Sequence, residues 1–550
     1  MDGITWEYTF DTVVVGSGAA GLMAALTAAN NGDKVVVLEK HKKYGGTTSI
    51  SGGQIWAPNN NKMKDFGLED SYEEALTYLK SVVGDNTEHE VLESFLRAIP
   101  EAIEYIEAHT PLRFQCIPKL LDYRQELPGS SKGGRTLDIK PISAEILEEK
   151  IDEVYLSPSF VPITYSETEK WHSFAYPKYI DQELVNDRKK NNIRTIGNAL
   201  IVGLFKGCLD AGVIFKKNVS VKELIKNERV EGVLADIEGE IVNIQARKNV
   251  ILATGGFEWN EKYRRRFLRG PLTAPASLPL STGDGLKMVM QVGADLANLN
   301  EAFWVPTVKI DGEEFEGKQL YRMTRGERSL PGSIMINRFG KRFVNEAANY
   351  NDTSKAFHYF DAVEYDYVNT PAWIILDSLF KSKYSVVTSL PGEEAPVWLT
   401  KAETLAELAE KIGVDTEILE KTVQEFNEHA KAGKDPEFHR GESQYNWYYG
   451  DPEHPINPSV GPLETGPYYA LRVYPGAIGT KGGAVINKHG QVLDVNENPI
   501  DGLYAVGNVA ASIMGPGYPG AGSTLGPAVA FGYLAGLHAS KNLNAGNAVV

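Results

Sequence analysis

The pattern of apolar and polar positions near the N-terminus predicts a strand, a helix and a second strand. Residues 10–15 form a short apolar, β-branched run of the kind found in buried parallel strands. Residues 21–31 are rich in Ala and Leu and predict a helix, which Gly32 can end. A second apolar run, residues 34–38, closes at Glu39. These segments predict one βαβ unit with a short crossover.

The middle of the chain has a more mixed pattern. Residues 72–106 predict helix, broken at residues 84–86 and interrupted at Pro100. Residues 110–190 are rich in loops and aromatic residues. The aromatic residues between Trp171 and Tyr179 either line an apolar pocket or fill a core, and the sequence favours neither interpretation.

The remaining elements follow the same signals. Strands are predicted at residues 213–215 and 230–233, as part of a small β-meander, and at residues 248–256 and 503–508. Helices are predicted at residues 197–211, 401–411, 415–432 and 525–537. The last residues, 542–550, are expected to form a frayed tail. The pattern therefore predicts a mixed α/β protein.

Composition narrows the class of protein. Of 550 residues, 42% are hydrophobic and 23% charged, and the net charge of −16 argues against nucleic acid or anionic membrane as the main partner. The two cysteines, Cys116 and Cys208, provide no disulfide framework, and the ten histidines form no metal-binding motif. There is no signal-peptide pattern and no apolar run of about 18 residues. We predict a soluble, cytoplasmic protein without a metal.

The turn after the first strand reads Gly-Ser-Gly-Ala-Ala-Gly over residues 16–21. With 53 glycines in the chain, such spacing is weak evidence alone, because about half a match is expected by chance. Its context is stronger, since it follows a strand, opens a helix and precedes Glu39 at the end of the next strand. Glycines allow close approach to a pyrophosphate at the helix N-terminus, and Glu39 can accept ribose hydroxyls. We predict a dinucleotide site.

The cofactor is expected to be FAD, because only one such turn is present and a tightly held cofactor is simpler than two nucleotides. Residues 45–53, which are rich in Gly, Ser and Thr, offer backbone amides and hydroxyls for phosphate and flavin. The predicted cofactor-binding residues in these two regions are Gly16, Gly18, Ala19, Ala20, Gly21, Glu39, Lys40, Gly46, Thr47, Thr48, Ser51, Gly52 and Gly53.

Nearly the whole chain resembles the flavoprotein family of fumarate reductase and succinate dehydrogenase. Two later segments, residues 253–256 and 502–508, carry the resemblance along the chain. It implies further FAD contacts from Ala253, Thr254, Gly255, Gly507, Asn508, Thr524 and Leu525. Members with covalent flavin place a His before the Thr of the loop, where this chain has Gly46, so non-covalent FAD is implied. The Arg and His residues that clamp a dicarboxylate in fumarate-reducing members are not identified here.

The C-terminal loop resembles a narrower branch, the 3-ketosteroid dehydrogenases. Residues 518–528 read Tyr-Pro-Gly-Ala-Gly-Ser-Thr-Leu-Gly-Pro-Ala, and residues 55–60 and 479–483 agree with that branch. The resemblance implies that the Tyr518 hydroxyl and the Gly522 amide hold a developing enolate. The helix that starts near Thr524 points its positive end at the flavin region.

The proton that leaves the α-carbon needs a base. Residues 342–350 resemble the stretch that places this base in the Δ1-dehydrogenases, which implies Tyr350, and residues 121–129 imply Tyr123 as its relay partner. Asn349 stands where the family usually has Pro, and residues 116–121 replace an aromatic, Pro-rich run. Both departures lie near the expected substrate.

The resemblance implies an oxidoreductase of the CH–CH group that desaturates a cyclic ketone, with 1,2-desaturation of a 3-ketosteroid as the first interpretation. The α-proton goes to Tyr350 and the β-hydride to flavin N5. Alternatives are a Δ4 desaturase or enone reductase, a dehydrogenase of a smaller ketone such as cyclohexanone, and a non-catalytic flavin-binding redox sensor. An external quinone or electron-transfer protein is the expected electron acceptor.

The expected fold is α/β, a Rossmann-type FAD-binding domain with an inserted α+β catalytic domain. We place the FAD-binding domain at residues 1–300 and 471–550 and the catalytic domain at residues 301–470.

Overall fold

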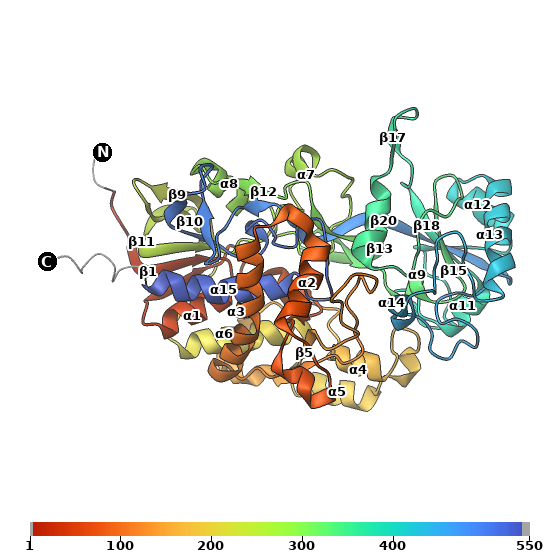
Figure 1. Cartoon of the computed structure of the whole chain (residues 1–550), viewed down its shortest axis with the longest axis horizontal. Helices are drawn as coiled ribbons and strands as arrows, with labels where there is room; N and C mark the ends of the chain where they lie inside the picture. Colours follow the sequence, from red (N-terminus) through yellow and green to blue (C-terminus); the bar gives the residue numbers. More distant parts are fainter. Residues whose placement is uncertain (1–3, 542–550) are drawn as a thin grey trace.

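Two β-sheets organise residues 4–541, the part of the chain that the computed structural model describes (Figure 1). The first sheet has eight strands in the order β22-β23-β11-β1-β2-β8, and β10 and β9 continue it from β11. Their bounds are β1 Tyr8–Val15, β2 Val35–Leu38, β8 Ile214–Lys216, β9 Val219–Lys226, β10 Val230–Ile237, β11 Glu240–Leu252, β22 Gln491–Leu493 and β23 Pro499–Ala505. Val13, at its centre, is fully buried, as the continuous apolar run of β1 requires.

The centre of this sheet is parallel, so its strands end at one edge. Val15 at the end of β1 pairs with Leu38 of β2 and Leu252 of β11, and Leu252 pairs with Ala505 of β23. Segments that follow these strands therefore meet at one place, which is where parallel sheets bind their ligands.

Helices α1 Ala19–Asn30 and α15 Leu525–Lys541 lie against one face of the first sheet (Figure 1). Helix α3 His89–His109 packs on α15, and helix α6 Ile196–Asp210 packs on α1. Helices α1 and α15 approach closely through glycines. A Cβ on Gly532 would lie 2.7 Å from the Ala20 carbonyl oxygen, and one on Gly536 would lie 2.6 Å from Cβ of Thr27. The C-terminal helix thus packs on the helix that follows the N-terminal glycine turn.

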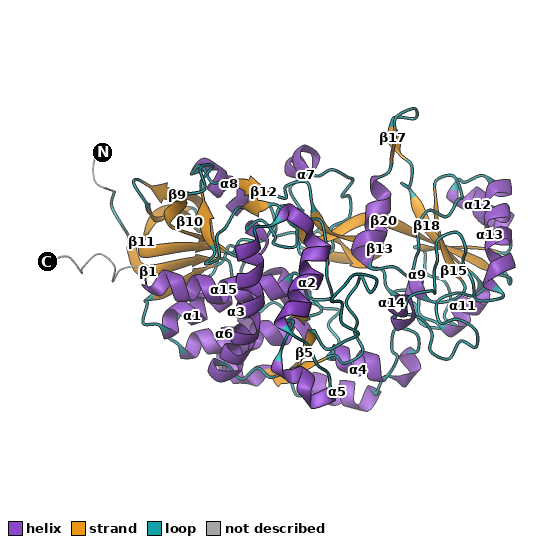
Figure 2. Ribbon diagram, in the orientation of Figure 1, coloured by secondary structure: helices purple, strands orange, loops and turns teal. Residues whose placement is uncertain are grey.

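The second sheet is antiparallel, in the order β14-β13-β20-β18-β15, with β19 also paired to β20. Helices α12 and α13 cover its far end (Figure 2). The bounds are β13 Ala302–Phe315, β14 Lys318–Met323, β15 Ser333–Asn337, β18 Ala372–Leu376, β19 Leu399–Ala402, β20 Tyr468–Thr480, α12 Leu405–Ile412 and α13 Thr416–Ala430. The long strands β13 and β20 reach from this sheet towards the first.

Shorter elements connect the two sheets. The helices are α2 Tyr72–Val83, α4 Tyr165–Lys170, α5 Gln182–Lys190, α7 Glu261–Phe267, α8 Asp284–Gln291, α9 Gly326–Ser329, α10 Tyr350–Lys355, α11 Ser378–Lys383 and α14 Gln444–Tyr448. The strands are β3 Ile55–Trp56, β4 Phe114–Cys116, β5 Thr136–Ile139, β6 Ile142–Ser143, β7 Ile193–Arg194, β12 Leu296–Ala297, β16 Phe360–Asp361, β17 Asp366–Tyr367 and β21 Gly483–Ala484.

Three local predictions are wrong. Helix α3 continues through Pro100, because its buried face, which includes Phe95 and Ile99, holds it in place. Strand β8 joins the parallel sheet beside β2 instead of forming a meander. Residues 399–402 are strand β19, and the helix after them begins at Leu405, where Thr404 caps it.

The predicted fold class is confirmed: a Rossmann-type sheet carries an inserted antiparallel sheet with helices. The exact division into domains stays a prediction, and β20 runs across the predicted boundary at residue 470. The predicted tail, 542–550, lies outside the described residues. No helix within residues 4–541 is long and apolar enough to span a membrane.

Candidate active site

The predicted cofactor residues gather at the edge where β1, β2, β11 and β23 end. The glycine turn follows β1, Glu39 and Lys40 follow β2, Ala253 to Gly255 follow β11, and Gly507 and Asn508 follow β23. Because these segments all follow the carboxyl ends of neighbouring parallel strands, one bound molecule can contact all of them.

The glycine turn is tight because its backbone touches the next strand and its own helix. Gly16 has φ +106°, and a Cβ there would lie 2.3 Å from the Ala253 carbonyl oxygen. A Cβ on Gly21 would lie 2.1 Å from the Gly16 carbonyl oxygen. Gly18, the N-cap of α1, provides no side-chain cap, so the start of the helix is open to an anion.

Glu39 and Ser17 join this turn to the loop at residues 45–53. Glu39 Oε2 accepts hydrogen bonds from the Ser17 amide (3.1 Å) and hydroxyl (2.6 Å), and Ser17 Oγ accepts one from the Gly45 amide (3.0 Å). Thr48 Oγ1 accepts a hydrogen bond from the Ala19 amide (3.2 Å). Glu39 is thus fixed at the end of β2, where a ribose hydroxyl can reach its remaining lone pairs.

Lys40 has a partner within the chain. Its Nζ lies 2.7 Å from a carboxylate oxygen of Asp284 and donates a hydrogen bond to Thr282 Oγ1 at 2.9 Å. The structure therefore gives Lys40 a role in holding β2 to α8, and its predicted contact with the cofactor stays a prediction.

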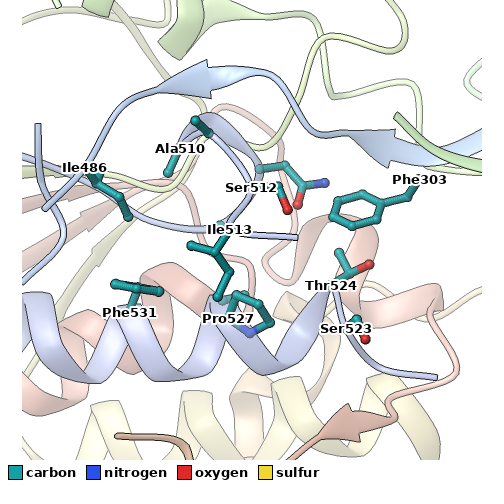
Figure 3. Close-up of a pocket in the computed structure, with 13 residues that line it drawn as sticks. Phe303, Ile486, Ala510, Ser512, Ile513, Ser523, Thr524, Pro527 and Phe531 are labelled. Carbon is teal, nitrogen blue, oxygen red and sulfur yellow. The ribbon is translucent and has the colours of Figure 1, made fainter. Parts of the chain in front are cut away.

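A pocket at the start of α15 brings the C-terminal predictions together (Figure 3). Gly507, Asn508 and Thr524 line it, together with Phe303 and Ser512. Nearby, the buried Thr254 hydroxyl has no hydrogen-bond partner within the described chain. These segments fit FAD: an open helix start for the pyrophosphate, a fixed carboxylate for the ribose, and an unpaired buried hydroxyl.

The three predicted catalytic tyrosines meet at one place. The ring centroid of Tyr350 lies 5.5 Å from that of Tyr123 and 5.4 Å from that of Tyr518, and Tyr123 and Tyr518 are 5.5 Å apart. Tyr123 and Tyr518 are almost fully buried, whereas Tyr350 is half-buried. We call these three residues the tyrosine cluster.

Hydrogen bonds fix the segment that carries each tyrosine. The Tyr123 amide donates to the Pro519 carbonyl (2.8 Å), which ties two tyrosine-bearing loops together. The buried Lys481 Nζ donates to the carbonyl oxygens of Gly515 (2.9 Å) and Gly517 (2.6 Å), just before Tyr518. Asn349 caps α10 by accepting a hydrogen bond from the Asp352 amide, which explains Asn in place of Pro before Tyr350.

Gly522 lies where no side chain fits. Its φ is +90°, and a Cβ there would lie 2.5 Å from the Trp56 amide nitrogen. Its carbonyl oxygen accepts hydrogen bonds from the amides of Trp56 (3.2 Å) and Gly526 (2.8 Å). The loop is therefore clamped between β3 and α15, and Ala521, the residue before Gly522, packs in the same buried group as the three tyrosines.

Burial raises the pKa of all three tyrosines above the ordinary value. For Tyr518, hydrogen bonds with Thr524 and Tyr350 and the charge of Arg325 oppose this rise. For Tyr123 and Tyr350, burial raises the pKa well above its usual range. A protonated Tyr518 suits a hydrogen-bond donor, while the role of Tyr350 as base stays a prediction that requires activation by its surroundings.

Further aromatic and charged residues line the site without having been predicted. Tyr445 lies 5.0 Å from Tyr123, Phe303 lies 5.6 Å from Tyr518, and Tyr449 lies 5.9 Å from Tyr445, between ring centroids. Arg325 is their charged neighbour. No motif marks these residues, because they come from separate segments that only the fold brings together.

The aromatic stretch near residue 174 packs within the fold, and its lining of a substrate pocket stays a prediction. Tyr176 is buried and donates a hydrogen bond to Asp451 (2.6 Å), which is a structural role. Phe174 packs instead against Tyr165 at 5.7 Å and faces Arg325. No group of metal-ligating side chains occurs within residues 4–541.

Comparisons with known proteins agree with this geometry. Residues 11–525 match the model of a family described as FAD binding domain. A 4-oxocyclohexanecarboxylate 2-dehydrogenase of Sinomonas cyclohexanicum is 40% identical over 537 residues, which cover 96% of this chain and 92% of that protein. A 3-oxosteroid 1-dehydrogenase of Mycobacterium tuberculosis is 39% identical over 562 residues, covering 96% of this chain and 98% of that protein.

A solved structure is also similar over its whole length. The 3-ketosteroid Δ1-dehydrogenase of Sterolibacterium denitrificans, in complex with 1,4-androstadiene-3,17-dione, superimposes with a TM-score of 0.90 at 35% identity, over 97% of this chain and 99% of that one. A flavocytochrome c3 fumarate reductase shares the fold, with a TM-score of 0.67 at 23% identity.

Proposed function

The chain belongs to the FAD binding domain family, in the branch of the 3-oxosteroid 1-dehydrogenases, and from this premise we propose that it desaturates a cyclic ketone beside its carbonyl group. It is an FAD-dependent oxidoreductase of the CH–CH group, as its sequence predicts. The observation that supports the proposed reaction most strongly is the tyrosine cluster, which packs with Ala521 and reaches the start of α15 through the Tyr518 and Thr524 hydroxyls.

In this proposal, each residue of the site acts on a different atom of the ketone. The Tyr518 hydroxyl and the Gly522 amide donate hydrogen bonds to the carbonyl oxygen and stabilise the enolate that develops there. Tyr350 first gives its own proton to Tyr123, whose ring lies 5.5 Å away and which passes a proton on to solvent. The resulting Tyr350 phenolate oxygen then accepts the α-proton. When bound, FAD supplies the acceptor for the hydride that leaves the β-carbon. The surrounding rings exclude water, which strengthens these hydrogen bonds.

The cofactor is held without a covalent bond in this proposal. Gly46 stands before Thr47, where the related flavoproteins with covalent flavin carry a His, and glycine offers no side chain for attachment. The predicted contacts of the glycine turn, Glu39 and Thr48 act instead.

The substrate shares a ring ketone with the donors named for the relatives. Those names include 3-oxosteroids and 4-oxocyclohexanecarboxylate, so both a steroid and a single-ring ketone are candidates for this chain. The electron acceptor, a quinone or an electron-transfer protein, and the cytoplasmic location stay predictions.

Product analysis tests the proposed reaction. Purified holoenzyme with an artificial electron acceptor is incubated with a neutral 3-ketosteroid, cyclohexanone and 4-oxocyclohexanecarboxylate. We expect at least one product lighter by two hydrogens and with an olefinic proton beside the carbonyl. If all of these ketones are recovered unchanged while dithionite still reduces the flavin, the desaturase proposal is wrong.

The same assay separates the alternatives. An enone reductase would leave the saturated ketones unchanged, but its dithionite-reduced form would be reoxidised by the enone without oxygen. A redox sensor would respond to neither ketone nor enone.

A further inference from the structure

Arg325 lies between β14 and α9 with its guanidinium among aromatic rings. Its Cζ lies 5.7 Å from the ring centroid of Tyr165 and 5.6 Å from that of Phe174. Tyr449 extends this wall: its ring lies 5.4 Å from Phe174 and its hydroxyl 2.7 Å from that of Tyr165. Cation–π contacts of this kind stabilise the charge but leave the N–H donors unused.

The N–H donors of Arg325 have almost no partner in the described chain. A guanidinium has five such donors, and the only side-chain acceptor within reach is the Met323 sulfur, 3.3 Å from Nη2. A thioether is a weak acceptor. The nearest carboxylate in the sequence, Glu327, instead accepts hydrogen bonds from the backbone amides of Arg325 and Val387, both at 2.9 Å. Arg325 forms no ion pair within residues 4–541.

Two neighbouring arginines differ from Arg325 in this respect. Arg322 forms a bidentate pair with Glu313, at 2.6 and 2.7 Å. The buried Arg328 donates hydrogen bonds to the carbonyl oxygens of Glu346 and Ala348, and so supports the segment before Tyr350. Structural partners therefore account for both of these side chains, but not for Arg325.

Arg325 also lies between the two halves of the candidate active site. A Cβ placed on Gly52, in the predicted flavin loop, would lie 4.0 Å from Arg325 Nη2. On the other side, the Arg325 charge reaches the tyrosine cluster, where it is one of the influences that oppose the effect of burial on the pKa of Tyr518. An anion bound to Arg325 would thus lie within the substrate site.

We propose that Arg325 binds a carboxylate of the substrate, so that the preferred donor is a cyclic ketone that carries a carboxylate. This rests on the proposed desaturase function. The planar fork of a guanidinium matches a carboxylate, and such a partner supplies the acceptors and the negative charge that the described chain does not. Tyr518 and Gly522 then hold the ketone at the other end. The carboxylate belongs either to a single-ring ketone or to the side chain of a ketosteroid.

Comparison of an acid with its ester tests this proposal directly. We expect the wild-type enzyme to prefer 4-oxocyclohexanecarboxylate over its methyl ester by about tenfold or more in kcat/KM, the effect of losing a charged hydrogen bond. Arg325→Leu should remove the preference, and Arg325→Lys should keep part of it. The matched control, Arg322→Leu, changes an arginine paired with Glu313 and should keep the full preference. The same pair made from a 3-oxosteroid with an acid side chain shows which ring system carries the carboxylate.

Several results would overturn the proposal. One is a wild-type enzyme that treats acid and ester alike for both ring systems, which can be measured even if an Arg325 variant does not fold. Another is an equal loss of activity with acid and ester in Arg325→Leu, which would mean that Arg325 acts on the tyrosines. Calorimetry with cyclohexanecarboxylate, which has no ketone, tests the carboxylate site at Arg325 separately from the desaturase reaction. Binding that depends on Arg325 supports the carboxylate site even if no ketone is oxidised, and a wild-type enzyme that does not bind this acid contradicts it.

Discussion

The surroundings of Tyr518 suit a hydrogen-bond donor. Tyr518 is almost fully buried, its hydroxyl lies 3.3 Å from that of Thr524, and its ring packs between Tyr123, Tyr350 and Phe303. Burial raises its pKa, so the hydroxyl keeps its proton and can donate a hydrogen bond to a developing enolate. Its ring would stay packed if the hydroxyl alone were removed.

Tyr518→Phe should therefore lower kcat by about 100-fold or more, the usual effect of losing one oxyanion donor. Flavin content and thermal stability should stay near those of the wild type. Tyr72→Phe is the matched control, because Tyr72 starts α2 outside the candidate active site and its buried hydroxyl has no hydrogen-bond partner in the described chain. A Tyr518→Phe enzyme as fast as the control would show that this hydroxyl is not the donor.

At the level of single residues, the sequence predicted those that lie in recognisable motifs. Tyr123, Tyr350 and Tyr518 come from three segments that resemble a known branch, and the structure brings them together. Arg325 could not be found in this way. Arg325 stands out because its guanidinium has no carboxylate partner among the described residues. Whether an arginine has such a partner, as Arg322 has in Glu313 on the neighbouring strand, is seen only in the folded chain.

Among the secondary-structure elements, the β1–α1 unit shows most directly how backbone shape makes a binding site. Gly16 combines a positive φ with a carbonyl contact that leaves no room for a Cβ. Gly18 gives the following helix no side-chain cap, and although the Ala19 amide donates to Thr48 Oγ1, the next amides of the first turn can face a phosphate.

Gly16→Ala should abolish flavin binding, because the added Cβ would lie 2.3 Å from the Ala253 carbonyl oxygen and force β1 and β11 apart. The measurement is the ratio of flavin to protein absorbance after purification. Gly32→Ala is the control: Gly32 also has a positive φ, +94°, but nothing lies within 4 Å of the added Cβ. If both variants lost flavin equally, backbone strain rather than this contact would be the cause.

The sequence predicted elements well where one signal dominated. β1, α1, β2 and α15 have continuous apolar runs, and their bounds agree with the structure to within a few residues. The sequence predicted the helix around Pro100 and the pairing of β8 wrongly. The burial of one face of α3 outweighs a missing hydrogen bond at Pro100, and the partner of a three-residue strand depends on the whole sheet.

Across the molecule, a buried ionic cluster connects the second sheet to the segment that bears Tyr350. Glu346 pairs with Arg342 (2.8 Å) and Arg440 (3.2 Å) and accepts a hydrogen bond from the Met335 amide in β15 (2.9 Å). Arg342 also pairs with Asp435 (2.7 Å). The Arg-Phe-Val-Asn-Glu motif before Tyr350 thus has a structural purpose, since its Arg and Glu fix the start of that segment.

Glu346→Gln should lower the free energy of unfolding at neutral pH by about 3–5 kcal/mol, because it leaves the buried Arg440 without a carboxylate and Arg342 with Asp435 as its main partner. Burial raises the pKa of Glu346, but the charges of Arg342 and Arg440 prevail and hold it below the ordinary value. Its stabilising effect is therefore complete above the unfolded pKa, near 4.3, and is lost as the pH falls through the lower folded pKa.

Chemical denaturation between pH 3 and pH 7 measures both effects. The wild type should lose stability on acidification more steeply than Glu346→Gln. Glu437→Gln is the control, since Glu437 is largely exposed and its carboxylate lies 3.7 Å from Arg342, farther than that of Glu346. A Glu346→Gln protein as stable as this control would contradict a role for the cluster.

The flavin site, the tyrosine cluster and Gly522 together predict hydride loss from the β-carbon of a ring ketone. Anaerobic mixing of the holoenzyme with a cyclic ketone, unlabelled or deuterated at the β-carbon, tests this most directly, with the visible flavin absorbance as the signal. We predict that the unlabelled ketone bleaches the flavin and that β-deuterium slows the bleaching. A flavin that dithionite reduces but that no carboxylated or neutral cyclic ketone bleaches would contradict the account.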